Sequence, residues 1–161
     1  MKVSALVKRL RFKEFIKLSW ILIQKPFYIL PTLFATKQTI DICNERYGRE
    51  HNLTGKPNAF RHALWNVLIS SNVLKINKSI RKSTTWAKKI TDLHEQLAPN
   101  DLLDKTMDLH NNKVGREIFR QNTGVKVSEF LQILDYKLKE AKGIKSFEEF
   151  KKTQPTLIYL N

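Results

Sequence analysis

The fold is decided by the stretch from Pro57 to Val73, which reads PNAFRHALWNVLISSNV. At about 100° per residue, five apolar side chains share one helical face: Phe60, Ala63, Leu64, Val67 and Leu68. The opposite face holds His62, Trp65, Asn66 and Ile69, where a surface helix would carry charged side chains. The stretch therefore predicts a helix covered on both sides, with His62 and Asn66 facing a cleft or a buried polar pocket.

Helical patterns also dominate the rest of the chain. Apolar spacing, together with capping and breaking residues, predicts five further long helices. They cover Val3 to Gln24, Thr32 to Tyr47, Ser83 to Leu97, Thr106 to Gln121 and Ser128 to Ala141. Ser146 to Glu149 matches a capping box that would begin a last short helix, and Thr156 to Leu160 suits a short strand or a packed extended end.

Composition agrees with this helical pattern. The chain has 161 residues, which is enough for one domain with its own core. Gly and Pro are scarce, at 5 each, and no pair of segments alternates as two strands would, so a β-sandwich or barrel is disfavoured. We therefore predict the all-α class, as a single-domain orthogonal bundle of about six or seven helices.

The start of the chain is basic and partly apolar. Residues 1–37 are expected to form an amphipathic helical segment packed on or flanking the core, while residues 38–161 carry the polar site of the same structural domain. Among the first 25 residues, seven Lys and Arg are opposed only by Glu14. Lys17 and Lys25 interrupt the apolar stretch, so it falls short of the ~20 uncharged residues of a membrane-spanning helix. No small-residue cleavage site follows a compact apolar run, so a signal peptide is not expected either.

Two interpretations of this basic segment remain open. It is either a first helix packed on the core, with its lysines in water, or a basic interfacial helix lying on an anionic bilayer. Both are compatible with a cytoplasmic protein, and the second would attach it to the inner face of the membrane. The lone Cys43 excludes an internal disulfide and a multi-cysteine zinc finger, and it fits a reducing compartment.

The net charge of +14 favours polyanionic partners. An anionic membrane surface and a phosphate-containing substrate both satisfy this condition. Nucleic acid satisfies it as well, but the sequence has no helix-turn-helix signature and no RNA-binding aromatic motif, so sequence-specific nucleic-acid binding is not expected.

His94 and Glu95 lie in the predicted helix from Ser83 to Leu97. The core face of that helix holds Trp86, Ile90, Leu93 and Leu97. His94 flanks this face beside small residues, which leaves room for another helix or a ligand. Glu95 is expected on the outer side, near the His94 edge, and Asp92 is expected farther from the site or in solvent.

The helix that follows has an unusual inward face. Its stripe holds Met107, Asn111, Val114 and Ile118. Asp108 and Gly115 flank this stripe, and Asp108 and Asn111 need partners there because buried polar groups are costly unless hydrogen-bonded. Gly115 costs about 1 kcal/mol relative to alanine in mid-helix, so it indicates the close approach of another backbone. His110 points to a different side, and both His110 and Asn112 are expected farther from the site or in solvent.

Three blocks of sequence carry a family resemblance. They are NAFRHALWN from Asn58 to Asn66, DLHE from Asp92 to Glu95, and MDLHNNKVGR from Met107 to Arg116. In order and spacing they resemble a family of bacterial helical domains of unknown function, whose pattern has Asp where this chain has Asn58. The resemblance covers roughly residues 56–120. It implies a helical domain, which occurs alone or at the C-terminal end of large secreted, toxin-like proteins, and it implies no established activity.

The first functional hypothesis is a hydrolase acting on a phosphoester or lipid substrate. His62, His94 and Asp108 would bind a divalent metal such as zinc, and Glu95 would act as general base on a bound water. In a metal-free version His62 is the base, oriented by Glu95 or Asp108.

The substrate contacts of such a hydrolase would come from neighbouring side chains. Arg61 suits a phosphate, because a planar guanidinium matches two oxygens, and Asn66 and Asn111 would complete the contacts. The second hypothesis is a non-catalytic module that binds a membrane or a partner. In that case the same polar residues form a structural hydrogen-bond network.

Overall fold

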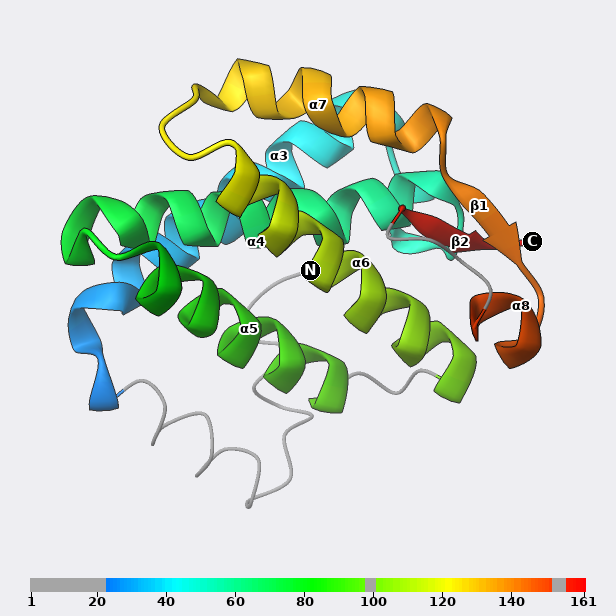
Figure 1. Ribbon diagram of the computed structural model, residues 1–161, viewed down its shortest axis with the longest axis horizontal. Coiled ribbons are helices and arrows are strands. Elements are labelled where there is room, and N and C mark those ends of the chain that lie inside the picture. Colours follow the sequence, from blue (N-terminus) through cyan, green and yellow to red (C-terminus); the bar gives the residue numbers. More distant parts are fainter. Residues whose placement is uncertain (1–22, 98–100, 152–155) are drawn as a thin grey trace.

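The computed structural model describes residues 23–97, 101–151 and 156–161. In this part of the chain six helices pack together (Figure 1). They are α3 (Ile29–Tyr47), α4 (Lys56–Asn77), α5 (Ile80–Leu97), α6 (Leu102–Gln121), α7 (Val127–Lys139) and α8 (Phe147–Lys151). Two 3-10 turns, η1 (Pro26–Tyr28) and η2 (Glu50–Asn52), flank α3. The predicted all-α class is confirmed, and no helix in the described ranges is long and apolar enough to cross a membrane.

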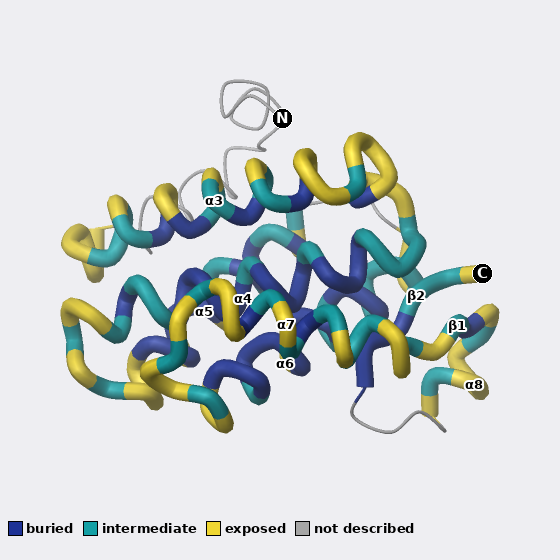
Figure 2. The backbone as a smooth tube through the Cα atoms, turned by 90° about the horizontal axis from the view of Figure 1, so that it is seen from above, coloured by how far each residue is buried: buried dark blue, intermediate teal, exposed yellow. Residues whose placement is uncertain are grey.

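Helix α4 lies at the centre of the bundle and contacts α3, α5, α6 and α7. Its predicted core face is confirmed, because Phe60, Ala63, Leu64 and the next turn of that face are at most 1% exposed. The opposite face is covered as well, since Ile69 and Asn66 are fully buried. Figure 2 shows the contrast between the buried α4 and the exposed outer side of α3.

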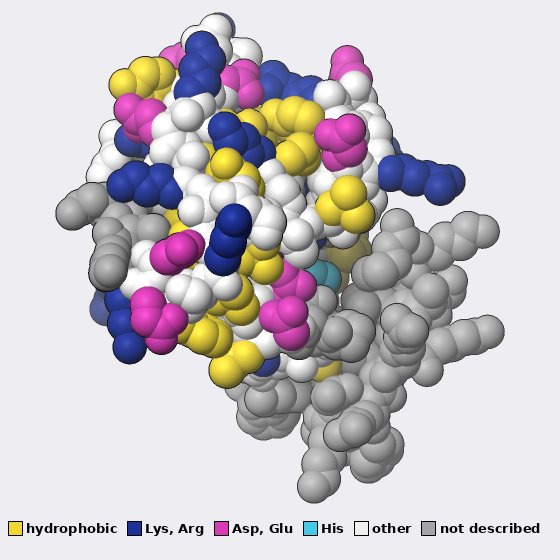
Figure 3. All heavy atoms as spheres, turned by 90° about the vertical axis from the view of Figure 1, so that its right-hand side faces the viewer, with side chains coloured by type: hydrophobic (Ala, Val, Ile, Leu, Met, Phe, Trp, Pro, Cys, Tyr) yellow, Lys and Arg dark blue, Asp and Glu magenta, His cyan; other side chains and the backbone are white. Residues whose placement is uncertain are grey.

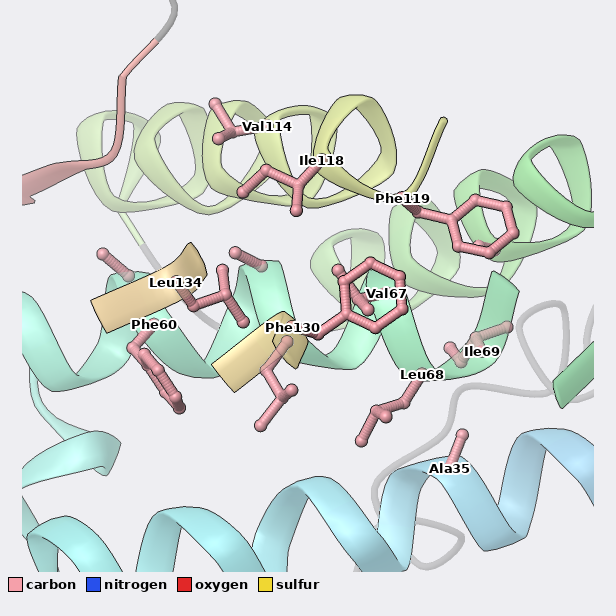
Figure 4. Packing of buried hydrophobic residues seen from close by; sticks show 14 of the residues in the cluster. Ala35, Phe60, Val67, Leu68, Ile69, Val114, Ile118, Phe119, Phe130 and Leu134 are labelled. Atoms are coloured by element: carbon pink, nitrogen blue, oxygen red, sulfur yellow. The ribbon is translucent and has the colours of Figure 1, made fainter. Parts of the chain in front are cut away.

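The hydrophobic core lies on both sides of α4. Figure 4 shows Val114, Ile118 and Phe119 of α6 above α4 and Ala35 of α3 below it. Phe130 of α7 stacks on Phe119, with ring centroids 6.4 Å apart. The polar site is therefore set inside a core that surrounds it with apolar packing.

A small parallel sheet closes one end of the molecule. Strand β1 (Lys142–Ile144) pairs with β2 (Ile158–Leu160), with Lys142 opposite Ile158. The strand-like tail was predicted, but a pair of strands was not. At this end Lys and Arg side chains alternate with Asp and Glu on the surface (Figure 3).

Three predicted helix starts were wrong by about one turn, and the first is that of α3, which begins at Ile29 rather than Thr32. Helix α6 begins at Leu102 rather than Thr106, because the Asp101 carboxylate accepts the backbone N–H of Asp104 at 2.9 Å and caps the helix. Helix α5 begins at Ile80, and Ser83 lies inside it with its hydroxyl bonded to the Ser79 carbonyl. Of the predicted first helix, only residues 23 and 24 fall within the described ranges, and both are helical.

Candidate functional site

Two rows of polar side chains face each other inside the core. They are Asn58, His62 and Asn66 on α4, and Asp108, Asn112 and Arg116 on α6. Each row has the spacing i, i+4, i+8, which places its members on one side of a helix, and all six residues are buried. Because α5 covers the rows with Thr91 and Glu95, which are also buried, the site is a polar seam enclosed by three helices. We call these eight residues the polar seam.

Gly115 allows the two rows to come together. A Cβ atom at this position would lie 2.3 Å from the Ala63 carbonyl oxygen and 2.7 Å from the Ala63 Cα. Only glycine permits this approach of α6 to α4 without a shift of backbone. The predicted backbone contact at Gly115 is therefore confirmed, and it determines how closely the polar residues of the two helices meet.

Asn112 connects the three helices of the polar seam. Its Oδ1 accepts a hydrogen bond from Asn66 Nδ2 at 2.7 Å and lies 3.3 Å from His62 Nδ1. Its Nδ2 donates to Glu95 Oε1 at 2.8 Å. Arg116 then donates to Asn66 Oδ1 at 2.8 Å. Since Asn66 uses both of its polar atoms in these bonds, it holds the other side chains in place.

The imidazole of His62 lies between two carboxylates. Its Nδ1 is 3.3 Å from Glu95 Oε1, and its Nε2 is 3.3 Å from Asp108 Oδ1. Arg61 Nη2 lies 2.9 Å from the same Nε2. A guanidinium can only donate, so Nε2 carries a lone pair and the ring proton sits on Nδ1, facing Asn112 and Glu95. His62 is therefore neutral, and its two carboxylate contacts are not ion pairs.

The pKa values of the cluster agree with this protonation state. Burial lowers the pKa of His62 to about 4, although Asp108 opposes the shift. Burial also raises the pKa of Asp108 to about 6, against the opposing effect of His62, and burial raises the pKa of Glu95. At neutral pH the site thus combines a neutral imidazole lone pair with carboxylate oxygens in a poorly hydrated interior.

His62, Glu95 and Asp108 form a set that could hold a metal ion. Each offers one ligand atom, and these atoms lie within 4.8 Å of one another. A tetrahedral ion with bonds of about 2.0–2.2 Å separates its ligand atoms by about 3.4 Å, so ligand atoms that lie up to 4.8 Å apart have to approach one another to bind it. Glu95 Oε2 is buried and has no hydrogen-bond partner in the described ranges, so it is available as a ligand.

The structure brings together a different set from the three residues expected to bind metal. Glu95 is 1% exposed and lies in the cluster, so its expected position on the outer side of α5 was wrong. His94 is half-buried, and its ring packs edge-on against Trp65 with centroids 5.2 Å apart. Adjacent residues of a helix point about 100° apart, and α6 covers the side of α5 on which Glu95 lies.

Two neighbouring asparagines have exchanged the places expected for them. Asn111 binds the backbone of β2, donating to the Ile158 carbonyl at 2.8 Å and accepting the Ile158 N–H at 3.0 Å. Asn112, expected near solvent, is fully buried beside His62. His110 faces another way, as predicted, because its Nε2 lies 2.7 Å from the Thr156 carbonyl oxygen.

Arg116 and Asn58 were missed as members of the polar seam. A signal existed in the sequence, because Asp108, Asn112 and Arg116 repeat the spacing of Asn58, His62 and Asn66. At Asn58, where the resembling pattern has Asp, the side-chain oxygen is buried and has no hydrogen-bond partner in the described ranges. Two helices that carry polar residues at the same spacing indicate a buried polar site more strongly than any single residue does.

These features define a class of protein, an all-α domain with a buried His–carboxylate cluster between three helices. The chain belongs to the family described as "Domain of unknown function (DUF6973)", which matches residues 19–142. This confirms the resemblance drawn from the three sequence blocks. No curated protein and no solved structure matches the chain.

The protonation state of His62 leads to a prediction about pH. The folded-state pKa of His62 lies below its ordinary value, so its neutral form contributes stability above about pH 6.5, and this contribution is lost as the pH falls towards 4. The stability advantage of the native protein over the variant His62→Asn is therefore expected to grow as the pH rises from 4 to 6.5. Urea unfolding of both proteins at a series of pH values, with a chelator present, measures this difference.

The matched control for that experiment is Asn122→Ala, which removes a half-buried side chain that does not titrate and lies outside the cluster. The raised pKa of Asp108 acts in the opposite direction and itself depends on His62, so the comparison is repeated in the Asp108→Asn background, where this titration is absent. An advantage that shrinks between pH 4 and 6.5 would show that His62 is protonated in the folded state.

Proposed function

We propose that the protein is a metal-dependent hydrolase acting on a phosphoester, with a divalent cation such as zinc bound by His62, Glu95 and Asp108. The observation that carries this proposal is the set of three buried ligand atoms within 4.8 Å. One imidazole with two carboxylates suits a catalytic zinc site, which keeps a position open for water. A bound cation would lower the pKa of that water and so generate a nucleophile near neutral pH.

The contact between His62 and Asp108 supports a cation at this point. Nε2 of His62 accepts from Arg61 and also lies 3.3 Å from Asp108 Oδ1. The Arg61 guanidinium holds these two acceptors together, and a metal ion bound between them would take over that role and release Arg61 towards the substrate. Burial raises the pKa of Asp108 to about 6, although His62 opposes the shift. A metal ion bound by Asp108 would displace a proton from this carboxyl and release it to solvent.

Arg61 is the residue proposed to contact the phosphate. Its guanidinium donates to Asn52 Oδ1 at 3.2 Å and to His62 at 2.9 Å, so it reaches from an exposed side chain to the buried cluster.

Isothermal titration of zinc and of manganese into chelator-treated full-length protein tests the proposal. We expect saturable binding at one site, with affinity falling at least about tenfold in Asp108→Asn and in Glu95→Gln, since each loses a charged ligand. The matched control is Asp92→Asn, which lies one turn before Glu95 on α5 and pairs with Lys88. Its affinity should equal that of the native protein.

Hydrolysis is then measured on a phosphodiester and on a short-chain phospholipid, with and without metal. Metal-dependent turnover that is lost in Asp108→Asn and lowered in Arg61→Lys is the expected result. Turnover that needs no metal but is lost in His62→Asn would instead indicate general-base catalysis by His62. Its ring lies between Glu95 and Asp108, and either carboxylate could orient it. If neither metal binding nor turnover is detected, the polar seam is a structural hydrogen-bond network and the proposal is wrong.

A further inference from the structure

An apolar groove lies far along α4 from the polar seam, where α3 begins and α4 ends. Apolar side chains dominate its lining, with two lysines at the edge: Leu30, Pro31, Leu33, Phe34, Lys37, Asn72, Lys75 and Ile76. In Figure 1 this end of the molecule is marked by the blue start of α3. None of these side chains takes part in the cluster around His62, so the groove is separate from the proposed metal site.

The first half of α3 and the turn before it expose large apolar side chains. Phe27 is 79% exposed, Leu30 is 77% exposed and Phe34 is 63% exposed, and Ile23 and Leu33 are each more than half exposed. The inward side of the same helix, by contrast, buries Ala35, as expected for packing on α4. Soluble monomers rarely expose several large apolar side chains side by side, so such a patch indicates an interaction surface.

The charge around the groove has a single sign. Residues 15–40 and 51–91 contain no Asp or Glu, so η1, the first half of α3 and all of α4 present only Lys and Arg as charged residues. Lys37 and Lys75 line the groove, and Lys25 and Lys78 are exposed nearby in the chain. The nearest acidic residue along α3 is Asp41, which lies one turn after Lys37 and pairs with it. The opposite end of the molecule, in Figure 3, carries both signs.

We propose that this groove and its lysines form a docking surface for an anionic lipid bilayer. Exposed aromatic and aliphatic side chains would enter the boundary between headgroups and acyl chains, and the lysines would contact the anionic headgroups. Charge decides between this partner and the alternatives. The segment before residue 23 has an excess of Lys and Arg, and a second copy would present the same lysines, so neither is complementary in charge to this surface. The headgroups of an anionic lipid bilayer have the opposite charge and are complementary.

Vesicle flotation with the full-length protein tests this surface. We expect binding to vesicles of phosphatidylcholine and phosphatidylserine at low salt, weaker binding at high salt, and none to phosphatidylcholine alone. The double variant Leu30→Glu with Phe34→Glu should lose at least about tenfold in affinity, because two apolar anchors become acidic. Lys75→Gln should lose about fivefold, the effect of about 1 kcal/mol for one lysine near an anionic surface.

The matched control is Leu53→Glu, which changes a side chain of similar exposure (65%) outside the groove. Its vesicle binding should equal that of the native protein. Vesicle binding of Asp108→Asn should also be unchanged, which would show that membrane docking does not depend on the metal site. Unchanged binding in the double variant would overturn the proposal, as would equal binding to neutral vesicles. It would also be overturned if the double variant mainly lowered the unfolding temperature or dissolved a dimer in sedimentation, because the groove would then be filled by the chain itself or by a second copy.

Discussion

Replacing Gly115 with alanine is expected to lower the free energy of unfolding by about 3 kcal/mol, the upper part of the range for overpacking a core. The added Cβ would lie 2.3 Å from the Ala63 carbonyl oxygen, so α6 or α4 has to move. Helix propensity acts in the opposite direction, since alanine is better than glycine by roughly 1 kcal/mol in mid-helix. A net destabilisation therefore measures the helix contact itself. Thermal and urea unfolding of the full-length variant give the value.

The control for this variant is Gly55→Ala. A Cβ at Gly55 would meet only Pro57 Cδ, at 3.7 Å, and the φ of Gly55 is −79°, which alanine adopts readily. We expect a change of less than about 1 kcal/mol there, the size of an N-cap effect. If Gly115→Ala were as stable as the native protein, the close approach of α6 to Ala63 would be wrong.

Replacing Asn112 with alanine is expected to destabilise the protein by about 3–4 kcal/mol. The variant removes one donor and one acceptor from the centre of the polar seam, so Glu95 Oε1 and Asn66 Nδ2 each lose a hydrogen bond in a buried place. Each unsatisfied buried group costs about 1–3 kcal/mol, and an ionised one more. The same variant should weaken metal binding, because Glu95 loses the bond that orients it.

The comparison variant for Asn112 is Asn122→Ala, at the end of the same helix. Its side chain makes one hydrogen bond, to the Ile118 carbonyl at 2.8 Å, and it is half-buried. We expect a loss of about 1 kcal/mol there. Equal losses in the two variants, measured by urea unfolding, would mean that Asn112 does not connect the three helices.

The central helix and the close contact at Gly115 could be predicted because both depend on local rules. Helical periodicity places Phe60 and Leu64 on one face and His62 on the other, whatever surrounds them. A glycine in mid-helix is costly without a contact that requires it. In both cases the residue itself carries the information, and tertiary packing only adds the partner.

The membership of the cluster could be predicted only in part. A helical wheel gives the angle between His94 and Glu95, or between Asn111 and Asn112, but it does not say which neighbouring helix covers each side. On α5 the covered side proved to be that of Glu95, and on α6 the second asparagine faced His62 while the first bound β2. The sheet was missed for a related reason. Strands β1 and β2 have three residues each and depend on contacts distant in sequence.

The polar seam also limits how the helices can move. If α6 slid along α4 by one turn, roughly 5.4 Å, Asn112 would leave its partners and Arg116 would lose its bond to Asn66, while the notch at Gly115 would no longer face Ala63. A slide by one turn would therefore leave buried polar groups without partners or force a backbone clash. Sliding of this kind, which serves as a switch in other helical proteins, is closed to this pair. A motion that exposes His62 has to lift α5 away, which would break the hydrogen bonds that Glu95 makes with Asn112 and Thr91 makes with Asn66.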